Sequence, residues 1–257
     1  MTDRPRPYIL AETTWQDVRE TLFEVAVLPW GSTEPHNLHL PYATDVVETE
    51  RLAAEAARRA WQAGAPVVVL PAIPYGANAQ QADLRGTVNM DPSTQLSVLR
   101  DIVDSLEAQA IPKLLVLNGH GGNDFRPLIR EIQARTDVFL CLVDWFRMPT
   151  DGIFDEPGDH AGELETSLML HLAPELVRPL EEAGSGAEHP FRIDALREPW
   201  AWAPRQWRLA TDDTGVGDPS AATADKGAAF FEACAARLAG FLEELASADL
   251  DDLYVAE

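Results

Sequence analysis

Short apolar runs alternate with longer amphipathic stretches between residues 25 and 143 of the chain. Each run is rich in valine and leucine without alternating polar positions, which is typical of a β-strand that is buried on both faces. The runs cover residues 25–28, 67–70, 114–117 and 138–143. They predict four strands of a parallel sheet.

The stretches between these runs have the apolar spacing of helices. The first covers residues 46–63 and ends before Gly64, the second begins near Pro92 and runs to about Ala110, and the third covers residues 124–136. Proline is favourable in the first turn of a helix. Strands that alternate with helical crossovers predict an α/β fold, with a mostly parallel sheet covered on both faces and right-handed connections.

Polar side chains follow the predicted strands. In parallel α/β sheets, ligands bind at the carboxyl ends of the strands. The residues at those ends that could carry chemistry are Glu34, His36, Tyr75, Asn78, His120 and Asp144. The pattern therefore predicts a functional site at this edge of the sheet.

The C-terminal part of the chain has an irregular stretch followed by a strong helix. Residues 182–217 lack a periodic pattern and contain Trp200, Trp202 and Trp207 near prolines. Because an irregular stretch rarely buries three tryptophans, we expect it to contact a neighbouring subunit; the alternative is that it covers an edge of the chain's own sheet. Residues 218–246 predict a helix with an apolar stripe that packs on the core.

The size and charge of the chain limit the number of domains and the classes of binding partner that we expect. The 257 residues fit one domain, which we expect to span residues 1–257. With 42 acidic and 20 basic residues the formal net charge is −22, and Lys113 and Lys226 are the only lysines. Such a surface disfavours nucleic acid and anionic membranes as partners.

The chain also shows no sign of membrane insertion or secretion. No apolar run approaches the roughly 20 residues that a membrane span needs, and the opening MTDRPRPYIL lacks the apolar stretch of a secretory signal. We therefore expect a cytoplasmic protein. Its two cysteines, Cys141 and Cys234, lie in apolar surroundings and are expected to be buried free thiols.

The first cluster of candidate chemistry is the polar segment 31–45, which follows a predicted strand directly. It contains Glu34, His36 and Asp45, and this mixture of carboxylate and imidazole suits Zn, Mn or Fe. A carboxylate at position 45 could bridge two ions. The alternative is a polar loop in which Asp45 only caps the following helix.

The second cluster is Asn-Gly-His-Gly-Gly-Asn at residues 118–123. Glycines around His120 allow the backbone to approach a ligand closely, and amide groups at the following helix start could stabilise an oxyanion. The turn lacks the lysine of a nucleotide-binding loop. The alternative is a lone histidine without a functional role.

The third cluster covers residues 159–167 and contains His160 and Glu165 ahead of an apolar helix. These residues could act in chemistry, or they could form only an acidic helix start. No G-x-S-x-G motif occurs, and neither cysteine lies near a histidine, which disfavours serine and cysteine hydrolases.

Together the clusters resemble the creatininase (creatinine amidohydrolase) family. The resemblance rests on four motifs in the family's order: Gly-Ser-Thr-Glu-x-His-x-x-His-Leu-Pro-x-x-Thr-Asp from residue 31, Asn-Gly-His-Gly-Gly-Asn from residue 118, His-Ala-Gly-x-x-Glu-Thr-Ser from residue 160, and Gly-Asp-Pro…Ala-Thr-x-x-Lys-Gly through residues 217–227. It implies a three-layer α/β/α sandwich, a small-molecule amide as substrate and a homo-oligomer, often a homohexamer.

The resemblance also implies a centre of two divalent ions, Zn, Mn or Fe. Glu34, Asp45 and His120 match the ligands of one ion. His36 and Asp45 match ligands of the other, with Asp45 bridging the two, and Glu165 is expected to complete the second site.

Departures from creatininase itself concern the substrate. Gly121 replaces an aromatic residue that shapes creatinine binding, and Gly122 replaces a glutamate that completes the second ion site there. The segment 76–81 also differs from the family's G-x-S-x-E-H. We therefore expect creatinine to be a poor substrate, and we assign substrate binding to Gly121, Gly122, Asn78 and Trp145.

The predicted activity is hydrolysis of a non-peptide C–N bond in a cyclic or linear amide. A hydroxide between two cations would attack the carbonyl, and His160, which matches the family's proton shuttle, would pass a proton to the departing nitrogen. The alternatives are a deformylase or lactam hydrolase of a biosynthetic pathway, and a non-catalytic metal-binding family member.

Overall fold

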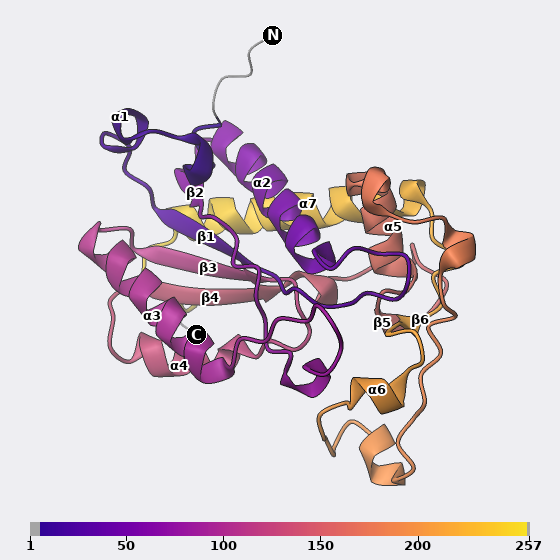
Figure 1. The fold of residues 1–257 in the computed structure, drawn as a ribbon. Helices are drawn as coiled ribbons and strands as arrows, with labels where there is room; N and C mark the ends of the chain where they lie inside the picture. Colours follow the sequence, from indigo (N-terminus) through magenta and orange to yellow (C-terminus); the bar gives the residue numbers. More distant parts are fainter. Residues whose placement is uncertain (1–5, 256–257) are drawn as a thin grey trace.

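Four parallel strands form the central sheet of the computed structural model, which describes residues 6–255 (Figure 1). The strands are β1 (Val25–Trp30), β2 (Val67–Val69), β3 (Lys113–Asn118) and β4 (Phe139–Asp144). Their order is β2-β1-β3-β4, and every neighbouring pair is parallel. The strands predicted from the apolar runs are therefore confirmed, with small shifts at their ends.

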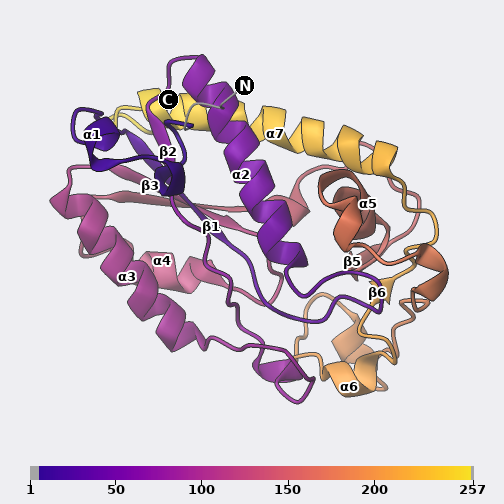
Figure 2. The ribbon, with the colours of Figure 1, turned by 45° about the horizontal axis from the view of Figure 1, so that its top comes forward.

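Helices cover both faces of this sheet (Figures 1 and 2). They are α2 (Thr44–Gln62) and α7 (Ala224–Ser247) on one face, and α3 (Pro92–Ala108) and α4 (Phe125–Gln133) on the other. Adjacent residues of β1 point to opposite layers, so Val27 packs with α2 and α7, whereas Leu28 packs with α3 and α4. The predicted α/β/α sandwich is confirmed.

The start of α2 changes the interpretation of one acidic residue. The helix begins at Thr44, two residues before the predicted start, so Asp45 lies inside the first turn. Ala43 occupies the N-cap position. The alternative in which Asp45 serves only as a helix cap is therefore wrong.

The fourth sequence motif fixes α7 against α5 (Glu163–Leu172). The Thr223 hydroxyl caps α7 by accepting a hydrogen bond from the backbone N–H of Lys226 at 3.2 Å, so the helix begins after Thr223 and not at residue 218. The Lys226 ammonium donates to the buried carboxylate of Glu163. These contacts hold the first turn of α5, which carries one of the predicted metal ligands.

Several short elements complete the structure (Figure 1). Beyond the carboxyl ends of the strands lie α5, the antiparallel pair β5 (Gly158–His160) and β6 (Val216–Gly217), and α6 (Trp207–Ala210). A short helix, α1 (Trp15–Val18), lies near the opposite end of the sheet. Single turns of 3-10 helix cover Leu10–Glu12, Ala79–Gln81, Trp145–Arg147, Pro174–Leu176, Leu180–Glu182 and Asp194–Arg197. Within residues 6–255, no helix combines the length and apolar character needed to span a bilayer.

The tryptophans of the irregular stretch have different surroundings. Trp200 and Trp202 are 77% and 84% exposed, whereas Trp207 is only 7% exposed. Their contact with another subunit remains a prediction.

Both cysteines are free thiols, but only Cys234 is fully buried, while Cys141 is partly buried. Burial raises the pKa of each thiol to about 12, which makes both poor nucleophiles at neutral pH.

Candidate metal centre

Six acidic and histidine side chains converge beyond the carboxyl ends of the strands. The loop after β1 supplies Glu34 and His36, the first turn of α2 supplies Asp45, and the turn after β3 supplies His120. Two further residues, His160 from β5 and Glu165 from the first turn of α5, reach the cluster from the C-terminal part of the chain. Five of the six are buried, and Glu165 is partly buried.

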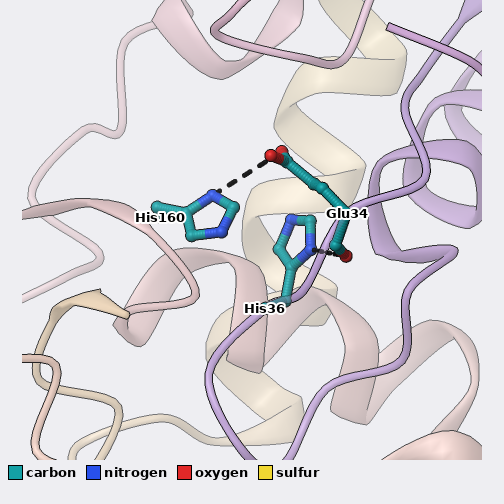
Figure 3. Close-up of side chains that lie close together, drawn as sticks. All are labelled: Glu34, His36 and His160. Atoms are coloured by element: carbon teal, nitrogen blue, oxygen red, sulfur yellow. Dashed lines mark hydrogen bonds and ion pairs between the residues drawn. The ribbon is translucent and has the colours of Figure 1, made fainter. Parts of the chain in front are cut away.

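The cluster divides into two triads that share one residue. In the first triad, one donor atom from each of Glu34, Asp45 and His120 lies within 4.8 Å of the others. In the second triad, His36, Asp45 and Glu165 meet the same limit. The structure therefore brings together the residues expected for each ion, with Asp45 common to both. Glu34, His36 and His160 form a third close group (Figure 3).

Backbone carbonyls orient the three histidines. His36 Nδ1 lies 3.1 Å from the carbonyl of Glu34, His120 Nε2 lies 3.2 Å from that of Ala77, and His160 Nε2 lies 2.9 Å from that of Pro35. Because a carbonyl can only accept, each of these nitrogens carries the proton and donates. The other ring nitrogen of each histidine is left to face the cluster, which is the arrangement of metal-binding histidines in proteins.

Carboxylate–imidazole pairs dominate the electrostatics of the cluster. His120 Nδ1 lies 2.8 Å from Glu34 Oε1 and 3.1 Å from Asp45 Oδ2, and His36 Nε2 lies 2.8 Å from Asp45 Oδ1. Burial lowers the pKa of His36, but the Asp45 carboxylate outweighs this effect and raises it to about 10.

The same pairs also shift the pKa values of the carboxylates. Burial raises the pKa of Asp45, but His36 and His120 hold the net pKa below its usual range. Burial raises the pKa of Glu165 despite the opposing effect of His36. Cations at this position would displace the imidazolium protons, so metal affinity is expected to fall as the pH decreases.

Two observations test whether this site fits metal ions. His36 Nε2 and Asp45 Oδ2 are buried, and apart from the ion pairs within the cluster they have no hydrogen-bond partner among the described residues. Buried polar atoms usually have such partners, and here they point into a cluster of mixed nitrogen and oxygen donors. This donor set suits Zn, Mn or Fe. The residues present therefore fit divalent cations.

Comparison with known proteins identifies the family. The sequence model of creatininase, described as creatinine amidohydrolase, matches residues 11–242. The chain belongs to the creatininase family. It is 31% identical over 236 residues to a mycofactocin precursor peptide peptidase of Mycobacterium tuberculosis, covering 85% of this chain and 86% of that protein. It is 27% identical over 225 residues to the creatinine amidohydrolase of Pseudomonas putida, covering 74% and 83%.

Solved structures agree with this assignment. The crystal structure of a Bacteroides fragilis protein described as a creatinine amidohydrolase superposes with a TM-score of 0.90 at 44% identity, over 95% of this chain and 98% of that chain. A creatininase structure of Zn-Zn type has a TM-score of 0.78 at 23% identity, over 94% and 99%, which shows the shared fold.

The two glycines that follow His120 in this creatininase-family member, Gly121 and Gly122, differ in the space around them. A Cβ atom added at Gly122 would lie 2.4 Å from His120 Nε2 and 2.5 Å from the carbonyl of Ala77. Any side chain there would therefore disrupt the hydrogen bond between His120 Nε2 and the Ala77 carbonyl, which orients the His120 ring. At Gly121, by contrast, an added Cβ would have no neighbour within 4 Å. The backbone at Gly121 therefore borders open space.

Gln81 is a site residue that sequence reasoning missed. It is fully buried, and its side-chain amide donates to Glu34 Oε2 and to Asn78 Oδ1, the latter at 3.1 Å. Gln81 thereby orients the carboxylate of Glu34, a candidate metal ligand, through its Oε2 atom. Gln81 occupies the histidine position of the family's G-x-S-x-E-H segment, and that correspondence could have identified it.

Two of the residues expected to bind substrate are buried. Asn78 is fully buried, and its amide donates to Ser32 Oγ at 2.6 Å and to the Val88 carbonyl at 2.9 Å. Trp145 is 1% exposed, and its indole N–H donates to Thr49 Oγ1 at 3.0 Å. Both side chains therefore support the structure around the centre, and their contact with substrate stays a prediction.

Glu48 is a second residue that sequence reasoning missed. It lies three positions after Asp45 on α2 and is 2% exposed, and neither carboxylate oxygen has a hydrogen-bond partner among the described residues. Burial raises its pKa well above the usual range, and the negative charges of Glu165 and Asp45 add to this effect. A small void lined by Glu48, Trp145 and Phe230 lies behind it.

Proposed function

We propose that this creatininase-family hydrolase cleaves a C–N amide bond with the help of two divalent cations. One cation would be held by Glu34, Asp45 and His120, and the other by His36, Asp45 and Glu165. The observation that carries the proposal is the pair of triads with Asp45 in common. The Zn-Zn form of a structurally similar creatininase supports zinc as one candidate metal.

Bound divalent cations activate water as a nucleophile and polarise a carbonyl oxygen. The chain's own residues supply the proton transfer. Since His160 Nε2 donates to Pro35, its Nδ1 faces the centre, 3.9 Å from Glu34 Oε1 (Figure 3). From this position, Nδ1 can carry a proton to the nitrogen that leaves the amide.

The surrounding backbone contributes to the same reaction. Gly121 borders open space, and the N–H groups of Gly121 and Gly122 are proposed to stabilise the oxyanion that forms on the carbonyl. Trp207 and the Pro35 carbonyl restrict water around His160 from the other side. Proton transfer would therefore take place at a histidine that is only 7% exposed.

The substrate class is an amide rather than creatinine in particular. A peptidase and an amidohydrolase each hydrolyse an amide C–N bond, and this chain is related to one of each. Without a side chain at 121 or 122, the site lacks a wall to hold a small ring such as creatinine. We therefore propose a small linear or cyclic amide, with formamides and lactams as the first candidates, and a poor creatinine activity.

The test compares chelator-treated protein with protein reloaded with Zn, Mn or Fe, on a panel of formamides, lactams, creatinine and short peptides. We expect two ions per chain and metal-dependent release of an amine from at least one panel member. Glu165→Gln should weaken metal binding about 10–100-fold. Two tightly bound ions with no hydrolysis of any panel member would instead indicate a non-catalytic metal-binding protein.

We also propose that the protein is a homo-oligomer, with the exposed Trp200 and Trp202 at a subunit contact. Analytical ultracentrifugation of the protein and of the Trp200→Ser/Trp202→Ser double variant is the measurement. A monomer in both cases would contradict the proposal.

A further inference from the structure

Trp207 packs directly against the histidine that carries the proposed proton transfer. The two ring centroids are 4.6 Å apart with an interplanar angle of 61°, an edge-to-face arrangement. The ring of His36 also lies close to His160, with the two centroids 4.1 Å apart. The His160 ring thus contacts both a candidate metal ligand and Trp207, the first residue of the short helix α6.

Long-range ion pairs hold Trp207 in this position. The guanidinium of Arg205 lies over the indole, 5.1 Å from the ring centroid. Arg205 is itself fixed by both carboxylate oxygens of Asp159, at 3.2 and 3.0 Å, and by Glu188 at 3.1 Å. Asp159 immediately precedes His160 in β5, so the ion pair anchors the tryptophan to the strand that carries the histidine.

A second pair anchors the opposite end of this segment. Arg208 Nε lies 2.8 Å from Asp83 Oδ2, and its guanidinium also donates to the Asp83 carbonyl at 3.1 Å. Asp83 follows the turn that contains Gln81, which contacts Glu34. The segment 205–208 therefore spans the centre, from the His160 strand to the loop that supports a candidate metal ligand.

We propose that Trp207 is a positioning residue for His160: its edge-to-face contact, secured by Arg205, keeps the imidazole bound to the Pro35 carbonyl with Nδ1 facing the centre. The inference rests on the proposed amide hydrolysis for its kinetic consequences. Its structural content, the orientation of one ring, does not depend on that function.

The physical argument is that a single hydrogen bond leaves the imidazole one rotation about it. The bond from Nε2 to Pro35 fixes one atom of the ring, and contacts with neighbouring rings are needed to fix its plane. His36 supplies one contact and Trp207 the other. Small displacements of a catalytic group can lower the rate by up to about 100-fold, so a loosened ring should lower kcat without changing metal binding.

The first experiment uses two variants of similar apolar volume, Trp207→Phe and Trp207→Leu, in the metal-loaded enzyme. Phenylalanine keeps an aromatic edge near His160, whereas leucine keeps only apolar packing. We expect Trp207→Phe to retain kcat within about 3-fold and Trp207→Leu to lose about 10-fold or more, with two ions bound in both. Trp15→Leu is the matched control, because this 77% exposed residue of α1, at the opposite end of the sheet, should tolerate the same change. Equal losses in the phenylalanine and leucine variants would overturn the proposal.

A double-variant cycle separates positioning from general stability. If Trp207 acts through His160, Trp207→Leu should have little further effect on kcat once His160 has been changed to alanine. A loss of the same factor in both backgrounds would show that Trp207 contributes independently of His160 and would contradict the inference.

A readout independent of turnover keeps this test distinct from the test of the proposed function. Crystal structures of Trp207→Phe and Trp207→Leu should show the His160 Nε2–Pro35 hydrogen bond retained in the first and lost or disordered in the second. An unchanged imidazole in Trp207→Leu would refute the positioning role, even if no amide substrate were found.

Discussion

The candidate metal ligands and the cover over His160 are positioned in two different ways. Glu34, His36 and His120 stand on turns that directly follow buried strands, and Asp45 lies in the first turn of a helix packed on the sheet. The cover, residues 205–208, belongs to a segment that is irregular except for α6. Its place depends on pairs such as Arg205–Asp159, which join residues distant in sequence.

This difference predicts a difference in robustness. A strand end cannot move without breaking the sheet, whereas partly exposed ion pairs each contribute only about 0.2–1 kcal/mol and weaken with salt. The candidate metal ligands at the strand ends should therefore keep their geometry in most variants. The cover is the part of the site that can be displaced while the protein stays folded.

The largest effect should come from the residue that both triads share. Asp45→Ala is expected to lose both ions, because each triad then has one carboxylate fewer, and to reduce hydrolysis by more than about 10⁴-fold, since water activation disappears with the metals. Elemental analysis of the purified variant measures the ions. Glu50→Ala, an exposed acid on the same helix, is the control. Retention of two ions would show that Asp45 is not the bridging residue.

His160→Ala acts where the two regions meet. We expect both ions to remain, because neither triad contains His160, while kcat falls about 10²–10⁴-fold with the loss of the proton carrier. Metal content and steady-state kinetics on the same preparation provide the check. Loss of an ion would instead make His160 a ligand.

Gly122→Ala tests how closely the candidate metal ligands at the strand ends are packed. The new Cβ would push against His120 Nε2 and the Ala77 carbonyl, so we expect metal affinity to fall about 10–100-fold. Gly121→Ala adds the same atom to open space and should bind metal as the parent does. Competition titration with a chromophoric chelator measures both. Equal affinities in the two variants would mean that the His120 ring can shift without consequence.

Glu48→Gln should give the smallest effect, one on stability. The folded-state pKa of Glu48 is raised, so the folded protein binds its proton more tightly than the unfolded chain does. Stability from this group is therefore complete below the ordinary glutamate pKa and is lost as the pH rises towards the folded value. In chelator-treated protein, the variant should gain about 1–3 kcal/mol over the parent at pH 8 and little at pH 4. Denaturant unfolding at both pH values is the measurement, and an equal difference at each would refute the assignment.

Much of the centre could be predicted because its residues lie at strand ends within motifs. The apolar runs placed β1 and β3, and Glu34 and His120 follow those strands within a few residues. The parallel order of the sheet then brings both to one edge. The assignment of Glu165 needed the family resemblance, since the spacing of the third cluster alone was equally compatible with an ordinary helix start.

The burial of individual side chains near the site could not be predicted from the sequence. Asn78 and Trp145 lie near the site in sequence order, but the packing turns both inward, where their polar groups bond to Ser32 and Thr49. Whether a side chain at a strand end faces substrate or core depends on the neighbours that fill the space. That information is spread over the whole chain.

The sequence by itself determined the α/β/α architecture, the family and the set of candidate metal ligands, because strand periodicity and local motifs encode them over short distances. Only the tertiary structure decided that Gln81 supports Glu34, that Glu48 is buried without a hydrogen-bond partner in the described part of the chain, and that Trp207 packs on His160. Each of these contacts joins residues separated by long stretches of chain or depends on burial by distant elements. Their energies arise from proximity and desolvation, which exist only after the layers have packed together.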